Sequence, residues 1–455
     1  MRAALCCALM LPLGDGGSAS PPPLPAPPLP AVVPQPLSLV VSGGSVTLDT
    51  AFGFVVSGGE ASSTLEAALK RFSALLHDDD SSAATGDATL ASCAVTVRTP
   101  SLELSASTDE SYSLTVATDS CAIESPTVYG AMHGMETFVQ LVRRANRSVP
   151  TVVVTDRPRF AFRAAMIDTA RHWLPIQVIL QHLDAMGATK MNVLHWHLVD
   201  SQSFPYVSTA FPQLSEHGAY GKAEVYTADD IKRVAQYAQE RGIRIIPEVD
   251  TPGHVWAGLA AMTPPVLTDC IGTDGSVVGT GPMDPSKETT FSFLETLLKE
   301  VVPLFGSSSF MVGGDEVPHD CWASNPAVVE FVRSRGWGSD MGKLERYYNQ
   351  RLQVYLILSS TWTRSGLAPT RKLPLQRSEL APFRVQDILA AQNTSVMCWE
   401  EVFQSGVALR NDSLVNVWSG GWEWCEKPTS VSKNGPFEPF IFKNEHFTRT
   451  SSGQT

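Results

Sequence analysis

Short apolar runs that end in charged or aromatic residues recur along this chain and constrain its fold more than any other feature. Helical patterns separate them: apolar residues at helical spacing follow an N1-type Pro175, and capping residues open further helices at Thr227 and Asn325. The runs occupy residues 165–172, 191–200, 243–254, 310–317 and 395–401. This alternation of strands and helices predicts a (β/α) barrel with functional groups at one rim.

The fourth run carries the most informative dipeptide, Asp315-Glu316, directly after an apolar stretch and two glycines. Partial burial at the mouth of a strand raises a carboxyl pKa towards neutral pH, where the group works as a general acid or base. Regular alternation would send the two side chains to opposite faces, so both reach one ligand only where the strand ends. The alternative is a pair of solvated acids or a helix cap.

The region from about residue 33 to 157 has a different pattern of predicted helices and strands. Amphipathic helices are predicted over residues 62–76 and 128–144. The predicted strands of an antiparallel sheet are residues 93–97, 101–105 and 112–116. Since no catalytic set is evident there, we expect a small α+β domain that packs on the barrel domain, residues 158–455.

The first 20 residues begin with Met1-Arg2, continue as an apolar run and end in small residues, which is typical of a secretory signal peptide. A proline-rich lead-in follows over residues 21–36. The apolar run is too short to span a bilayer, and no later segment has the required length. The net charge of −12 argues against nucleic acid and anionic membrane surfaces as partners.

Of the eight cysteines, two lie in this leader, which leaves six in an oxidising compartment that allows disulfides. Cys93 and Cys121 are candidates for one bridge, whereas Cys398 and Cys425 are expected to be buried or free. Glycosylation sequons begin at Asn146, Asn393 and Asn411. The expected destination is the secretory pathway, and then the lysosome, the vacuole or the exterior.

Four motifs share a family pattern in order and spacing: Asp168–His172 (DTARH), His195–Asp200 (HWHLVD), Asp250–His254 (DTPGH) and Gly313–Glu316 (GGDE). The pattern resembles the β-N-acetylhexosaminidases of glycoside hydrolase family 20, above all the lysosomal-type eukaryotic enzymes. The resemblance implies a (β/α)8 TIM barrel behind a small α+β domain. It also implies a glycosidase that removes terminal β-linked N-acetylglucosamine or N-acetylgalactosamine, with no metal or other cofactor.

The resemblance further implies a retaining, substrate-assisted reaction, in which the 2-acetamido oxygen of the substrate attacks the anomeric carbon and forms an oxazolinium ion. Glu316 would protonate the leaving oxygen and later activate water. Asp315 would hold the acetamido N–H and offset the developing positive charge. Asp200 and His254 would relay protonation to Glu316.

Substrate contacts also follow from the resemblance. Arg171 would grip sugar hydroxyls with its fork of donors, whereas Trp399 and Trp418 would wall the acetamido pocket. A disulfide between Cys270 and Cys321 would join two rim loops. The same pattern gives Cys121 a partner other than Cys93, and it makes a homodimer the candidate assembly.

Two histidines leave a second enzyme class open. His195 and His197 are two residues apart on a predicted strand, share a face and could bind a metal ion. Further ligands would come from His254, Asp200 and Asp315. A metal-dependent barrel hydrolase is therefore the alternative enzyme.

The C-terminal part departs from the family pattern. Residues 354–385 have no counterpart, and the likeness fades beyond Trp418, so six candidate barrel strands are found rather than eight. We expect a truncated or mis-spliced gene product that, as written, is not a competent hexosaminidase, because an unclosed barrel exposes strand edges. A catalytically dead homologue that only binds sugar is the alternative.

Overall fold

The computed structural model describes a large part of the chain, namely residues 31–58, 61–77, 90–99, 101–307, 309–352, 395–407, 409 and 413–416. The predicted leader, the unmatched segment 354–385 and four individual residues of interest, Asn393, Asn411, Trp418 and Cys425, lie outside these ranges. Within them, none of the helices has the length and apolar character that a bilayer crossing requires.

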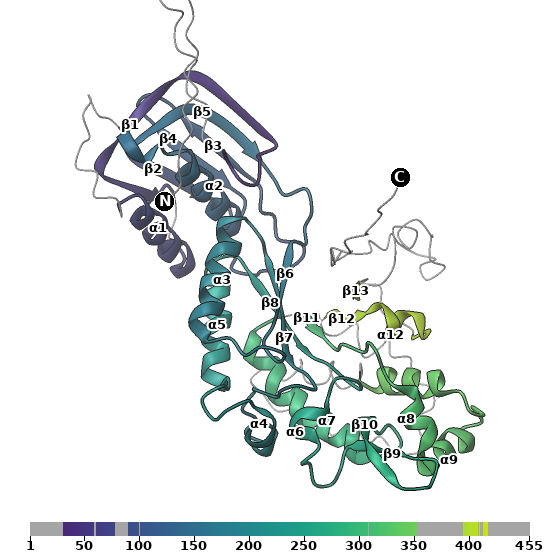
Figure 1. Cartoon of the computed structure of the whole chain (residues 1–455). Helices are drawn as coiled ribbons and strands as arrows, with labels where there is room; N and C mark the ends of the chain where they lie inside the picture. Colours follow the sequence, from purple (N-terminus) through teal and green to yellow (C-terminus); the bar gives the residue numbers. More distant parts are fainter. Residues whose placement is uncertain are drawn as a thin grey trace, which may run out of the picture.

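The N-terminal part is a five-stranded sheet with two helices (Figure 1). Its strands are β1 (Ser38–Val56), β2 (Leu90–Val97), β3 (Tyr112–Val116), β4 (Cys121–Ser125) and β5 (Ser148–Asp156). Its helices are α1 (Ser63–Leu75) and α2 (Val128–Leu141), with the short 3-10 helix η1 (Arg144–Asn146) after α2. The long strand β1 pairs with β5 through its first half and with β2 through its second half, which closes the sheet.

Three predictions for this part were wrong. Residues 101–105 form no strand, because the hydroxyls of Ser101 and Thr108 accept local backbone hydrogen bonds and hold the segment as a loop. The sheet is mixed rather than antiparallel, since β3 and β4 form a hairpin whose second strand aligns parallel with β2. The helix predicted over residues 128–144 ends at Leu141.

The C-terminal part contains six parallel strands within the described residues, in the order β13-β12-β11-β8-β7-β6. They are β6 (Ala164–Asp168), β7 (Val193–Val199), β8 (Arg244–Val249), β11 (Ser309–Met311), β12 (Ser395–Trp399) and β13 (Leu414–Asn416). The connecting helices are α3 (Ile176–Ala188), α5 (Ala228–Gln239), α7 (Glu288–Val301) with the 3-10 turn η2 (Val302–Phe305), and a helix over residues 341–352. Each strand lies beside its successor, which is the winding of a TIM barrel and confirms the predicted fold class.

Shorter elements surround the carboxyl ends of these strands (Figure 1). They are α4 (Gln213–Gly218), α6 (Trp256–Leu259), β9 (Leu267–Ile271), β10 (Val277–Met283), α8 (His319–Ser324), α9 (Pro326–Ser334) and α12 (Glu400–Gln404). The predicted caps are confirmed: Thr227 and Asp230 form a reciprocal capping box, and Asn325 accepts two backbone N–H bonds at the start of α9. Pro175 is the N-cap of α3 rather than its first helical residue.

A buried lysine joins the two parts of the chain. Lys190, between α3 and β7, has a left-handed backbone with φ 57° and is 4 % exposed. Its ammonium donates to Tyr112 at 3.0 Å, Thr137 at 2.8 Å and Asp156 at 3.2 Å. These partners come from three elements of the N-terminal part, so this side chain helps to fix that part against the segment before β7. Arg163 and Asn192, which both bond Glu110, add further contacts between the two parts.

Two disulfides are present among the described cysteines. One joins Cys270 on β9 to Cys321 on α8, as the resemblance implied. The other joins Cys93 to Cys121, so the expectation of a different partner for Cys121 was wrong. These two cysteines lie on the neighbouring strands β2 and β4, which brings their side chains together. Cys398 is buried and free.

Candidate active site

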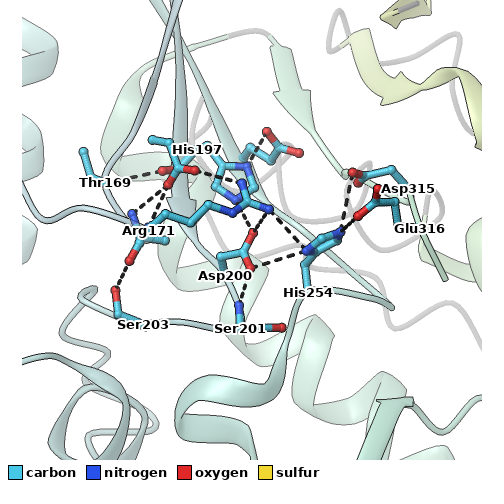
Figure 2. Close-up of polar contacts among 12 residues, drawn as sticks. Thr169, Arg171, His197, Asp200, Ser201, Ser203, His254, Asp315 and Glu316 are labelled. Carbon is cyan, nitrogen blue, oxygen red and sulfur yellow. Dashed lines mark hydrogen bonds and ion pairs between the residues drawn. The ribbon is translucent and has the colours of Figure 1, made fainter. Parts of the chain in front are cut away.

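Side chains from the ends of four parallel strands meet at one edge of the sheet (Figure 2). Arg171 follows β6, Asp200 follows β7 and His254 follows β8, whereas Asp315 and Glu316 both follow β11. The carboxyl ends of parallel strands lie on the same side of a barrel, which is why residues so distant in sequence converge. All five residues were predicted site residues, and the structure brings them together.

The two glycines before the acidic pair give it its geometry. Gly313 and Gly314 have φ of 69° and 95°, and Glu316 has a left-handed φ of 50°. A side chain at Gly313 would collide with the carboxylate of Asp250, and one at Gly314 would collide with Val402. The regular alternation of the strand therefore ends here, and both acids face the same histidine.

His254 lies between carboxylates on both sides (Figure 2). Its Nδ1 is 3.4 Å from Oδ1 of Asp200, and its Nε2 is 3.4 Å from Oε2 of Glu316 and 3.6 Å from Oδ2 of Asp315. The hydrogen bond with Asp200 and the charge of Asp315 raise the pKa of His254, against the effect of burial. These distances place His254 within ion-pair reach of all three carboxylates.

Arg171 is fixed by two acids. Its guanidinium bonds Oδ2 of Asp168 at 2.8 Å and Oδ2 of Asp200 at 2.8 Å, while its side chain stays 38 % exposed. The hydroxyl of Tyr220 donates to its backbone carbonyl at 2.9 Å. Arg171 is therefore more than a surface ion pair: two carboxylates orient its guanidinium, while part of its side chain stays accessible to solvent.

Glu248, near the carboxyl end of β8, is the functional candidate that sequence reasoning missed. It is fully buried, and its Oε2 lies 2.6 Å from Nε2 of His195 and 2.9 Å from Nδ1 of His197. Its Oε1 accepts from the indole N–H of Trp399 at 2.9 Å. A glutamate inside an apolar strand was the available signal, because acids are almost never fully buried unless they are paired.

His197 connects Glu248 to Asp200 at the carboxyl ends of the strands. Its Nε2 donates to Oδ2 of Asp200 at 2.9 Å. Burial opposes a charge on His197, but Glu248 and Asp200 outweigh burial and raise its pKa well above the usual range. Burial likewise opposes a charge on Asp200, yet hydrogen bonds with His197 and His254 lower its pKa. The imidazolium and its two carboxylates are thus mutually stabilised.

The contacts of the histidine pair do not suit a metal ion. His195 and His197 do share a face, as predicted, but both rings turn to Glu248. A metal ligand needs a free imidazole lone pair, whereas both nitrogens of His197 already face carboxylates, Nε2 facing Asp200 and Nδ1 facing Glu248, each at 2.9 Å. Donor atoms of His254, Asp315 and Glu316 also lie within 4.8 Å of one another, although these residues already form ion pairs.

A second carboxyl group lies behind Asp315. Asp250 is 1 % exposed, and its Oδ1 accepts the backbone N–H of Gly314 at 3.0 Å. Burial and the neighbouring Asp315 raise the pKa of Asp250 well above its ordinary value. Burial also raises the pKa of Asp315, although His254 opposes this effect. Asp315 therefore lies close enough to Asp250 to disfavour a negative charge on it.

Of the predicted pocket tryptophans, Trp399 lies at the end of β12 and is half-buried, with its ring centroid 5.8 Å from that of His195. Trp418 lies outside the described residues. Trp196 instead packs in the core, and its indole N–H donates to Thr169 at 2.9 Å.

Comparisons with known proteins agree with this arrangement. The glycosyl hydrolase family 20 catalytic domain matches residues 160–363, and a beta-acetyl hexosaminidase-like domain matches residues 32–141. Beta-hexosaminidase subunit beta of Homo sapiens is 38% identical over 332 residues, which are 72% of this chain and 53% of that protein. Subunit alpha of Bos taurus is 37% identical over 313 residues, 68% of this chain and 53% of its own length.

Solved structures show the same relationship. The X-ray structure of a chitobiase from Flavobacterium johnsoniae has a TM-score of 0.66 and 29% identity, and the match covers 86% of this chain and 55% of that chain. The chain thus spans about half the length of the curated relatives it matches. With two family domains in register and the acidic pair, the histidine and the arginine at the strand ends, the chain belongs to glycosyl hydrolase family 20.

Proposed function

We propose that this protein removes terminal β-linked N-acetylglucosamine or N-acetylgalactosamine from glycoconjugates or chitooligosaccharides. The observation that carries the proposal is His254, which bridges Asp200 to the Asp315-Glu316 pair at a strand-end rim. A histidine between carboxylates is suited to adjusting the proton affinity of a catalytic acid. Family membership supplies the reaction class for this geometry.

In the first half of the proposed reaction, the 2-acetamido oxygen of the sugar forms a bond to the anomeric carbon. The glycosidic C–O bond breaks, and the Glu316 carboxyl gives its proton to the leaving oxygen. Asp315 accepts the acetamido N–H and offsets the positive charge that develops on the oxazolinium ring. Oδ2 of Asp315 lies 3.6 Å from Nε2 of His254, whose charge lowers the pKa of Asp315 against the effect of burial.

In the second half, water attacks the anomeric carbon and the bond to the acetamido oxygen breaks. Glu316 takes the proton from this water, so the acid of the first half is the base of the second. The His254 cation, 3.4 Å from Glu316, stabilises the carboxylate that exists between the two steps. Retention of the anomeric configuration follows from two successive attacks on opposite faces.

The remaining predicted residues complete the proposal. Arg171, oriented by Asp168 and Asp200, grips sugar hydroxyls with its exposed donors. Trp399 and Trp418 wall the acetamido pocket, and the domains divide near residues 157 and 158. N-glycans on Asn146, Asn393 and Asn411 accompany passage through the secretory pathway to the lysosome, the vacuole or the exterior. The curated relatives are named as subunits, which motivates a homodimer for this chain.

The requirement for a 2-acetamido group tests this function. We expect the full-length protein to cleave nitrophenyl N-acetylglucosaminides and to leave the matching plain glucosides intact. A thiazoline mimic of the cyclic intermediate is expected to inhibit strongly, because it resembles the transition state. Efficient cleavage of plain glucosides would contradict the substrate-assisted mechanism. Loss of activity in EDTA would favour the metal-dependent hydrolase, and sugar binding without cleavage would indicate a binding protein.

A further inference from the structure

Glu248 has a role that the proposed reaction does not use. We propose that Glu248 is a positioning residue that couples the Trp399 indole ring to the His197–Asp200–His254 chain. The inference rests on the proposed function for its catalytic meaning, because Trp399 then lies beside the acetamido group and His254 beside the acid. Apart from the reaction, one buried carboxylate links Trp399 to the His197–Asp200–His254 chain.

The contacts of Glu248, on β8, come from two other strands. Its Oε2 accepts from His195 of β7 at 2.6 Å and lies 2.9 Å from Nδ1 of His197 on the same strand. Its Oε1 accepts from Trp399 at the end of β12 at 2.9 Å. Since β11 lies between β8 and β12 in the sheet, Trp399 reaches across one strand to make this bond. A ring held in this way has a direction set by the carboxylate.

From His197 the link continues to the proposed acid (Figure 2). His197 donates to Oδ2 of Asp200, and the other oxygen of Asp200 faces Nδ1 of His254 at 3.4 Å. His254 then faces Glu316 with its second nitrogen. Every neighbouring pair in the chain from Trp399 to Glu316 is within ion-pair or hydrogen-bond reach.

The charge of Glu248 affects the protonation of the linked groups from His197 to His254. The titratable groups that face His197 are Glu248 from β8, Asp200 from the end of β7 and Asp250, which follows β8 and whose pKa is raised. All of these groups are buried, so their interactions are screened far less than on the surface. Removing the charge of Glu248 would weaken the protonation of His197, and Asp200 would then lose its charge-assisted partner. A purely structural position would be served as well by apolar packing.

The substitution Glu248→Gln tests the coupling. Glutamine keeps the size, but donors face both oxygens of Glu248, so in either orientation the amide NH2 meets another donor, from the histidines or from the Trp399 indole. We expect the indole N–H proton signal of Trp399, assigned with Trp399→Phe, to move upfield in Glu248→Gln. We also expect the histidine titration of His197, followed by NMR of the full-length protein without substrate, to shift to lower pH. Measured kcat/KM should fall by roughly tenfold to a hundredfold, as misplaced catalytic groups do.

A double-mutant cycle separates coupling from general damage. Trp399→Phe should cost less kcat/KM in the Glu248→Gln background than in the wild type, because the bond is already lost. Glu110→Gln is the matched control, since Glu110 is also buried and bonds Arg163 at 2.8 Å away from the site. It should lower the melting temperature and leave the titration of His197 unchanged.

The outcomes distinguish the two proposals. Additive losses in the cycle, or an unmoved Trp399 signal in Glu248→Gln, would overturn the coupling even in an active hydrolase. Moved NMR signals in a protein that cleaves no N-acetylhexosaminide would preserve the physical link and contradict the proposed function instead.

Discussion

Glu316 and His254 are two non-glycine residues with left-handed backbones, at φ of 50° and 52°. This conformation costs on the order of 1–2 kcal/mol for a residue with a side chain, and it persists where the surroundings enforce it. Both residues belong to the proposed relay, and the backbone turn at each is what points its side chain at the other. The strained backbone at these two residues therefore directs the side chains of Glu316 and His254 towards each other.

Glu316→Gln should remove general acid catalysis. For substrates with poor leaving groups we expect kcat to fall by roughly a hundredfold to ten-thousandfold, because an unprotonated leaving oxygen departs slowly. The loss should be much smaller for dinitrophenyl glycosides, which need little protonation. Comparing kcat for both substrate classes measures the difference. Equal losses for both classes would remove Glu316 from the role of acid.

Glu345→Gln provides the matched control for this measurement. Glu345 is also paired with a histidine, His319, at 2.7 Å, but it lies outside the converging site residues. Its substitution should leave the ratio between the two substrate classes unchanged.

Gly314→Ala should destabilise the protein by about 2–4 kcal/mol. The new side chain would need φ of 95° and would press against Val402, so strain and overpacking add. Urea unfolding measures the change. Gly275→Ala is the control, because it has a φ of 81° with open space around it and should cost only about 1–2 kcal/mol. Equal losses at both positions would show that contact with Val402 is unimportant.

Much of the site could be predicted from the residues. Each of these site residues follows a strand: the acidic pair, His254, Asp200 and Arg171. The order and spacing of the motifs assigned them to one site from the sequence alone. Glu248 could not be assigned in this way. Its importance depends on which side chains lie across the sheet from it, and sequence separation of 151 residues hides its bond with Trp399.

At the scale of elements, periodic segments were predictable and irregular ones were not. The capping box at Thr227 and the strand Tyr112–Val116 match because local chemistry determines them. Residues 101–105 alternate like a strand, yet local side-chain hydrogen bonds replace sheet pairing there. The hairpin of β9 and β10 was missed, since its pairing depends on register rather than on a strong apolar pattern.

The disulfide between β9 and α8 makes an element-scale prediction. Replacing Cys270 and Cys321 by serine opens a loop with a sequence separation of 51 residues, for which chain entropy predicts a loss of about 4 kcal/mol. We expect a lower melting temperature together with reduced kcat, because α8 begins shortly after Glu316.

The pair Cys93→Ser and Cys121→Ser is the control for this double replacement. It opens a loop with a separation of 28 residues in the N-terminal part, and it should lower the melting temperature with little effect on kcat. Equal effects on kcat from both double replacements would contradict a specific support of the site by the Cys270–Cys321 bridge.

At the scale of the whole molecule, buried charges set a stability window in pH. The pKa values of His197 and His254 are raised in the folded protein, so their stabilisation is complete below about pH 6.5 and is lost as the pH rises. The pKa of Asp200 is lowered, so its stabilisation is present above about pH 3.9 and is lost on acidification. Maximum stability is therefore expected in mildly acidic solution.

Melting temperatures measured from pH 4 to pH 9 would check this window. The wild type should lose stability above about pH 6.5, and His254→Gln should lose less over the same range because one titrating group is gone. A wild-type melting temperature that rises steadily from pH 6 to pH 9 would refute the assignment of charged histidines.

The bridge between Cys270 and Cys321 also has a practical consequence for anyone who prepares this protein. Because Cys321 follows the acidic pair closely in sequence, a chain made in a reducing bacterial cytoplasm would carry that pair on an untethered segment. Such material would have the right mass and all the right side chains and still give a falsely low specific activity. The protein should therefore be expressed under conditions that oxidise thiols and assayed in buffers free of dithiothreitol, so that the measured activity is that of the disulfide-bonded form.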